Sequence, residues 1–170
     1  MTVLNGLDGL IGRDDYRHFC VTALDAMSRI VEDLGDERAN RRPALEGANS
    51  PFSLLTHCCG VVTFWVDHVV LGREVHRDRD AEFAAQGPVG PLLREVQELQ
   101  RRFAADLLAV EPAAPVRNPP AAPSRAVAPA ESVTQGFALQ HVYTELAQHL
   151  GQMEIIRDLI LAGEITPPEE

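Results

Sequence analysis

Three polar residues near the end of the chain have the types and the spacing of a metal site. His141, Glu145 and His149 follow one another at intervals of four residues, so in a helix they lie on one side, one turn apart. Burying a carboxylate and two imidazoles costs several kcal/mol unless a partner satisfies them, and one divalent metal ion would pair with all three. The alternatives are solvated pairs or a buried hydrogen-bond network.

A further ligand has to come from another helix, and His57 is the best candidate. It lies near the start of a predicted helix over residues 51–71, on the same side as Val61 and Phe64. That helix is apolar around most of its circumference, which is typical of the centre of a bundle. Imidazole and carboxylate suit zinc, nickel or iron. The alternative is a core histidine bonded to a backbone carbonyl; His68, nearly three turns later, is a weaker candidate ligand.

The three cysteines do not extend this set. Cys58 and Cys59 flank His57 in sequence, but residues one and two apart on a helix point in different directions. We interpret them as small buried hydrophobic residues. With Cys20 they make an odd count that forms no disulfide framework, and a reducing cytoplasm fits best.

Apolar residues at helical spacing predict four long helices, and no alternating pattern is long enough to indicate a sheet. The strongest start signal is Ser50 followed by Pro51, a capping hydroxyl before proline at the first helical position. The predicted fold class is therefore all-α. The predicted helices run from Asp14 or Asp15 to about Leu34, from Pro51 to about Leu71, from Pro91 through Leu107, and from Glu131 to Gly163.

Three connections of different character join these helices. Residues 36–49 are polar and include Arg41 and Arg42 side by side; we interpret them as a connection, with phosphate binding as a weaker alternative. Residues 73–86 are charged and predicted to cross the surface, with residues 77–80 solvated or paired among themselves. Residues 111–130 contain six prolines, so they form neither helix nor central strand. We interpret them as a long extended crossover that can span the bundle, or as a partly mobile linker.

Charge and missing motifs exclude several classes of function. The 170 residues carry a net charge of −10, which argues against a nucleic-acid partner and against an anionic membrane surface. No run of about 18 apolar residues predicts a transmembrane helix, and the first residues lack the pattern of a signal peptide. Neither a Gly-rich phosphate loop nor GxSxG, CxxC or HExxH is present, so standard hydrolase and nucleotide-binding functions have no support.

Two stretches resemble the DinB-like superfamily of metal-binding bundles. NSPFSLLTHCCGVVTFWVDHVVLGRE with RDRDAEF, which begins at Asn49, resembles the helix of the first ligand in actinobacterial DinB-like proteins. HVYTELAQHLGQMEIIRDLI, which begins at His141, resembles the last helix of the superfamily, where His or Glu is followed by three residues and then by His-x-Gly-Gln or His-x-Gly-His. The resemblance covers most of the chain and fits the Pro-rich segment least.

This resemblance implies an up-down-down-up four-helix bundle, as a single domain over residues 1–170, with one divalent metal in its core. Carried over residue by residue, it assigns the metal to His57, Glu145 and His149. Gln152 stands where many relatives have a second histidine, and it is expected to support a ligand or to contact the cofactor or substrate. DinB-like bundles often pair through their first and third helices, so a homodimer is a further expectation.

The superfamily also suggests a reaction. It includes bacillithiol and mycothiol transferases and the mycothiol-dependent maleylpyruvate isomerase, and Glu145 resembles the mycothiol-linked branch. The Ala- and Arg-rich, Lys-free composition favours mycothiol over bacillithiol. The isomerase's additional C-terminal domain has no counterpart here, which argues against that reaction.

We therefore predict a zinc-dependent transferase that activates a low-molecular-weight thiol, such as mycothiol, for S-transfer to a small electrophile. Three protein ligands leave an open position on the metal, as in catalytic sites. His141 is predicted to orient a ligand or relay a proton. The alternatives are a metal-dependent hydrolase of the same fold and a non-enzymatic, stress-associated metal-binding bundle.

Overall fold

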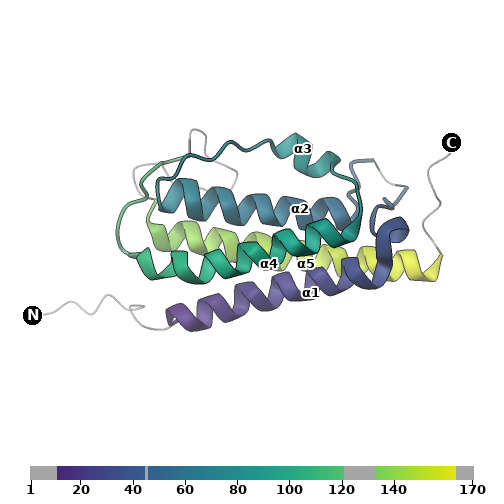
Figure 1. Cartoon of the computed structure of the whole chain (residues 1–170), viewed down its shortest axis with the longest axis horizontal. Coiled ribbons are helices and arrows are strands. Elements are labelled where there is room, and N and C mark those ends of the chain that lie inside the picture. Colours follow the sequence, from purple (N-terminus) through teal and green to yellow (C-terminus); the bar gives the residue numbers. More distant parts are fainter. Residues whose placement is uncertain (1–10, 45, 121–132, 164–170) are drawn as a thin grey trace, which may run out of the picture.

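Four long helices lie side by side and form the body of the protein (Figure 1). The structure is a computed structural model that describes residues 11–44, 46–120 and 133–163. These residues form helices and connections without a β-strand, which confirms the all-α fold class. The helices are α1 (Arg13–Ala39), α2 (Pro51–Val62) continued by η1 (Thr63–Val70), α4 (Val89–Asp106) and α5 (Gln135–Ala162).

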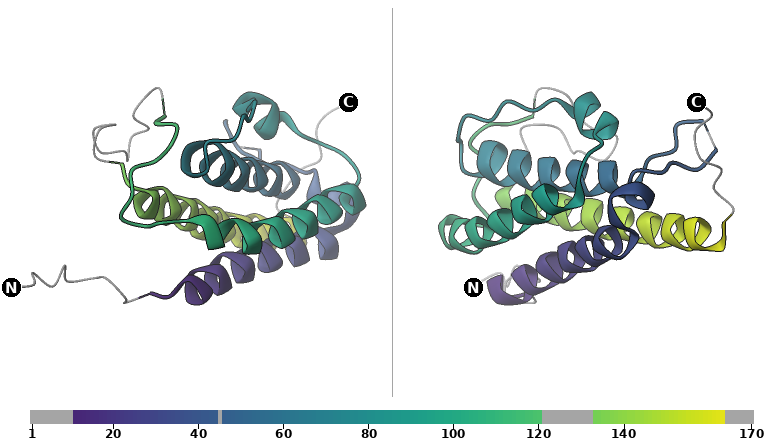
Figure 2. Two further views of the ribbon diagram at one scale, coloured as in Figure 1. Left: turned by 60° about the vertical axis from the view of Figure 1, so that its left-hand side comes forward. Right: turned by 45° about the vertical axis from the view of Figure 1, so that its right-hand side comes forward.

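The directions of these helices follow the predicted up-down-down-up order. α1 and α5 run one way through the bundle, while α2 and α4 run the other way (Figures 1 and 2). α2 and α4 are consecutive long helices that run in parallel, so the end of α2 and the start of α4 lie at opposite ends of the bundle. A long connection between these two helices is therefore required.

The first helix ends close to the predicted position, but in two steps. Gly35 has φ 67° and ψ 178°, which breaks the helical path, and a last turn then continues to Ala39. Glycine adopts a positive φ without steric cost, which explains why the kink falls at this residue. The kink turns the chain towards the loop that leads to α2.

The second helix begins where its capping signal predicts. The Ser50 hydroxyl accepts a hydrogen bond from the Ser53 N–H, the Ser53 hydroxyl accepts one from the Ser50 N–H, and Pro51 occupies the first helical position. Its second half, η1, is π-helical, a wider turn than the sequence predicts. Gly72, with φ 74°, follows the end of the helix. The predicted range of this helix, to about Leu71, is therefore confirmed, but the helix changes from α to π in its second half.

The same helix is the central one of the bundle. By length and composition alone, Pro51–Val70 would be long and apolar enough to cross a membrane, although no transmembrane helix was predicted. Most of its residues are buried against the other helices. Packing on several sides accounts for its wide apolar surface.

The connection that crosses the bundle is residues 72–88, between α2 and α4. It runs back over α2 and carries the short helix α3 (Arg79–Ala84) (Figure 2). The Arg73 guanidinium anchors the start of this connection. Its Nη1 donates to Asp67 Oδ1 and its Nη2 to Asp106 Oδ1, both at 2.5 Å. Arg42, from the loop before α2, donates from Nη2 to the Phe83 carbonyl at 2.7 Å and so holds α3.

The Pro-rich segment does not cross the bundle in its described part, which corrects the predicted path. It joins α4 to α5 at one end, where the Gly136 N–H donates to the Pro112 carbonyl and the Gln135 N–H to the Ala114 carbonyl, both at 2.9 Å. Because α4 and α5 are antiparallel, the ends to be joined are neighbours. Residues 121–130 of the predicted crossover lie outside the described residues.

Candidate metal centre

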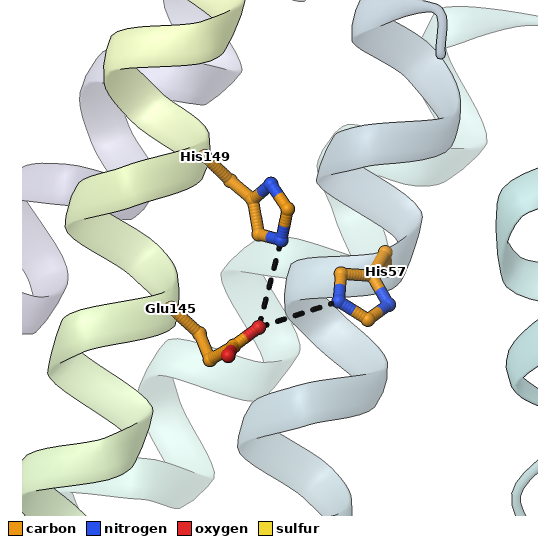
Figure 3. A group of neighbouring side chains, drawn as sticks. All are labelled: His57, Glu145 and His149. Atoms are coloured by element: carbon orange, nitrogen blue, oxygen red, sulfur yellow. Dashed lines mark ion pairs between the residues drawn. The ribbon is translucent and has the colours of Figure 1, made fainter. Parts of the chain in front are cut away.

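Two helices bring three candidate ligands together (Figure 3). His57 extends from α2, and Glu145 and His149 extend towards it from α5. Glu145 Oε2 lies 3.5 Å from Nε2 of His149 and 3.7 Å from Nε2 of His57. One ligand atom from each of the three residues lies within 4.8 Å of the other two. The three residues predicted as ligands are thus neighbours in space.

These separations fit shared ligation better than direct hydrogen bonding. Nitrogen–oxygen hydrogen bonds are usually about 2.7–3.2 Å long, shorter than both contacts of Glu145 Oε2. Four ligands placed about 2.1 Å from zinc in a tetrahedron are about 3.4 Å apart. In addition, His57 Nε2 is buried and has no hydrogen-bond partner among the described residues. A buried polar atom without a partner is costly, so the geometry fits a metal ion bound between the three side chains.

Helix periodicity places the two ligands from α5. The Thr134 hydroxyl caps this helix by accepting a hydrogen bond from the Phe137 N–H at 3.1 Å. From there α5 continues without a break through Glu145 and His149. Residues four apart on such a helix are neighbours on its surface, so the spacing alone brings these two side chains together.

The electrostatics of the centre keep the Glu145 carboxylate ionised. The neighbouring imidazoles of His149 and His57 hold the pKa of Glu145 well below its usual range, although partial burial opposes this. Burial lowers the pKa of His57, but the Glu145 and Glu82 carboxylates raise it by more, so the net shift is upward. A carboxylate beside two imidazoles is a donor set typical of zinc, nickel or iron sites.

His141 lies beside this group rather than within it. Its Nε2 is 3.8 Å from Glu145 Oε1, the carboxylate oxygen that faces away from the other two histidines, and its ring centroid is 4.4 Å from that of Trp65. Burial lowers the pKa of His141, so its imidazole is neutral at neutral pH. A neutral imidazole can both accept and donate a proton.

The outer nitrogens of both histidine ligands have partners. His149 Nδ1 is 3.0 Å from the side-chain oxygen of Gln152, and His57 Nδ1 is 2.8 Å from Glu82 Oε2. The Phe83 ring stacks on the His57 ring, with centroids 4.2 Å apart and planes inclined by 24°. Gln152 therefore contacts a ligand, while its role as a cofactor-binding residue stays a prediction.

The remaining candidates from the sequence lie elsewhere. His68 contacts the Arg73 carbonyl through Nδ1 at 2.9 Å and stacks on Phe64, away from the three ligands. Cys58 and Cys59 are buried, and burial raises the pKa of both thiols above the usual range. They behave as the predicted small hydrophobic residues and are poor nucleophiles.

Sequence reasoning missed the contribution of α3. Arg77 was predicted to be solvated or paired within residues 77–80, but it donates to Glu82 from Nε at 2.7 Å and from Nη2 at 2.8 Å. Burial raises the pKa of Glu82, whereas hydrogen bonds from His57 and Arg77 lower it by more. Only Asp78 as a helix cap and the apolar Phe83 within a charged stretch hinted that this segment folds back onto α2.

Comparison with known proteins identifies one family. The family model described as mycothiol S-transferase matches residues 16–162, which include every residue of the candidate centre. A search of curated proteins finds no significant match.

Proposed function

This chain belongs to the mycothiol S-transferase family, and from that premise we propose a metal-dependent transferase, with zinc as the metal. It would activate a low-molecular-weight thiol, such as mycothiol, for S-transfer to a small electrophile. The observation that carries the proposal is the convergence of His57, Glu145 and His149, with the buried Nε2 of His57 left without a hydrogen-bond partner in the described structure.

The residues present would hold the metal through two imidazoles and one carboxylate. Three protein ligands leave a coordination position for a substrate, as in catalytic zinc sites. A metal ion bound there would lower the pKa of a thiol and stabilise its thiolate at neutral pH. The ionised Glu145 offsets part of the metal's charge and remains flanked by His141 on its other side.

The protein's own thiols do not supply the reacting sulfur. Cys58 and Cys59 are buried with pKa values raised by burial, and Cys20 is buried with its pKa raised to about 11. Since thiolates rather than thiols are nucleophilic, the sulfur has to come from an external thiol. This supports a transferase that binds its thiol as a substrate.

His141 is proposed to move or hold a proton close to the reacting thiol. It is neutral at neutral pH, it lies one turn from Glu145, and the Trp65 ring limits its movement. It can accept the proton that a thiol loses or orient the leaving group of the electrophile. Its replacement by Phe is expected to reduce turnover about 100-fold or more while leaving metal content unchanged.

The test combines metal content with activity. Elemental analysis of the purified chain is expected to give about one zinc per chain, and the zinc-loaded protein is expected to consume mycothiol in the presence of an electrophilic aryl halide. Loss of the electrophile without thiol consumption would instead favour hydrolysis by the same centre. A chain that retains no added divalent metal would overturn the metalloenzyme proposal.

A further inference from the structure

We propose that Glu82 is a positioning residue that fixes the orientation and tautomer of His57, and that Gly60 provides the space in which its carboxylate sits. The ligand role of His57 in this inference rests on the proposed function. The contacts that hold the ring stand in the structure independently of any metal.

The hydrogen bond between Glu82 and His57 has a defined direction. Glu82 Oε2 lies 2.8 Å from His57 Nδ1, and an ionised carboxylate can only accept. A proton therefore sits on Nδ1, and in the neutral imidazole, the form that binds a metal, the lone pair of His57 is on Nε2, the atom that faces Glu145. Arg77 Nη2 also approaches Nδ1, at 3.4 Å, but two donors form no hydrogen bond with each other.

Glu82 is itself held in place. Arg77 binds it through two nitrogens, Nε to Oε1 at 2.7 Å and Nη2 to Oε2 at 2.8 Å. The side chains are 15% and 11% exposed for Arg77 and Glu82, respectively. A guanidinium that grips both carboxylate oxygens keeps the carboxylate ionised and gives it a defined orientation.

A glycine lies opposite this carboxylate. Gly60 lies within α2, where glycine is among the weakest helix formers. A Cβ atom at this position would lie 2.0 Å from Glu82 Oε1 and 2.5 Å from its carboxyl carbon. Any larger residue would push the Glu82 carboxylate away from its present place. The absence of a side chain at position 60 is therefore what lets α3 bring a carboxylate against α2.

A ring contact completes the arrangement. Phe83, the residue after Glu82, stacks on His57 at a centroid distance of 4.2 Å. Two consecutive residues of α3 thus restrain both the plane of the imidazole and the atom that carries its proton. Metal-binding histidines commonly donate their second N–H to a carboxylate, which fixes the tautomer and strengthens the ligand. The geometry gives α3 this role for His57.

The test compares zinc affinity of the metal-free full-length chain with that of two variants, by competition with a chromophoric chelator. Glu82→Ala removes the acceptor. Gly60→Ala leaves Glu82 in the chain but displaces its carboxylate, while raising intrinsic helix propensity. Both are expected to weaken zinc binding about 10- to 100-fold. The matched controls are Gly90→Ala, where a Cβ atom would make an ordinary contact at 3.6 Å, and exposed Glu74→Ala; both should bind as the wild type does.

A second readout separates this inference from the proposed function. Ring ¹⁵N chemical shifts of His57 in the metal-free wild type are expected to report a proton on Nδ1, and a tautomer mixture in both variants. If the wild type binds zinc and both variants bind equally well, the positioning role is overturned. If the wild type binds no zinc, the proposed function fails. The inference about Glu82 is then tested by the tautomer of His57 alone, and a proton on Nε2 in the wild type overturns it. If Glu82→Ala does not fold, the zinc affinity and the His57 tautomer of Gly60→Ala provide the test.

Discussion

The two sides of the candidate centre are built in different ways. On the α2 side, the His57 side chain is 2% exposed and is held by residues of α3, which lie more than 20 positions further along the chain. On the α5 side, Glu145 and His149 are 26% and 18% exposed, and the partner of His149 is Gln152, one turn away on the same helix. One side is thus fixed by tertiary contacts and the other by helix periodicity.

The two sides would therefore contribute differently to a metal site. A metal bound here would meet a His57 ring that is already oriented, and such a ring would lose little entropy on ligation. The more exposed side would leave room for exchange of metal and substrate. We therefore expect the thiol to approach from the α5 side, next to His141.

The largest expected effect comes from removing one ligand from either side. His57→Ala and His149→Ala are each expected to weaken zinc binding about 100- to 1,000-fold, since each removes roughly a quarter of a zinc-binding free energy of about 10–16 kcal/mol. Chelator competition measures both affinities. His68→Ala, from the same long helix as His57 but bonded to Arg73, is the control and should bind normally. Equal zinc binding by all three variants and the wild type would remove the basis for the assignment.

Metal removal is expected to have the next largest effect, on stability. Zinc at 100 times its dissociation constant stabilises the folded state by about 2.7 kcal/mol, which corresponds to about 5–10 °C in the unfolding midpoint of a chain of this size. Thermal unfolding with and without a chelator measures this shift. Because the ion would tie α2 to α5, His149→Ala should abolish the shift; a shift that persists in this variant would place the stabilising ion elsewhere.

A smaller effect is expected from the outer partner on the α5 side. Gln152→Leu removes a neutral hydrogen-bond acceptor from His149 and should weaken zinc binding about 3- to 10-fold, less than Glu82→Ala, because hydrogen bonds to charged groups are roughly twice as strong. Gln140→Leu, an exposed glutamine on α5, is the matched control. A loss for Gln152→Leu as large as that for Glu82→Ala would contradict the distinction between the two sides.

The smallest effect is expected at the outer edge of the α2 side. The Arg79 guanidinium lies 4.8 Å from the centroid of Phe83, and such an exposed cation–π contact contributes about 0.5–1 kcal/mol. Arg79→Ala should therefore lower the unfolding midpoint by about 1–4 °C and change zinc affinity by less than about 2-fold. A loss of affinity comparable to that of Glu82→Ala would show that α3 depends on Arg79 for its place on α2.

Much of the helical framework follows from local signals in the sequence. The cap at Ser50 and Pro51, the break at Gly35 and the apolar stripes predict the helices, because these signals act between residues close in the chain. The spacing of Glu145 and His149 predicts their contact for the same reason. The isolated polar character of His57 in an apolar helix made it the candidate third ligand.

The surroundings of His57 and the connections between the helices depend on tertiary contacts. Arg77 and Glu82 belong to a charged stretch that resembles a solvated surface, and their role depends on the path of residues 72–88 across the bundle. In the sequence, Gly60 is only a weak helix former. In the structure, Glu82 occupies the space that a side chain at position 60 would take. Likewise, the Pro-rich segment was long enough to cross the bundle, but the antiparallel order of α4 and α5 made a crossing unnecessary. These contacts join residues far apart in sequence, and no local pattern of residue types encodes them.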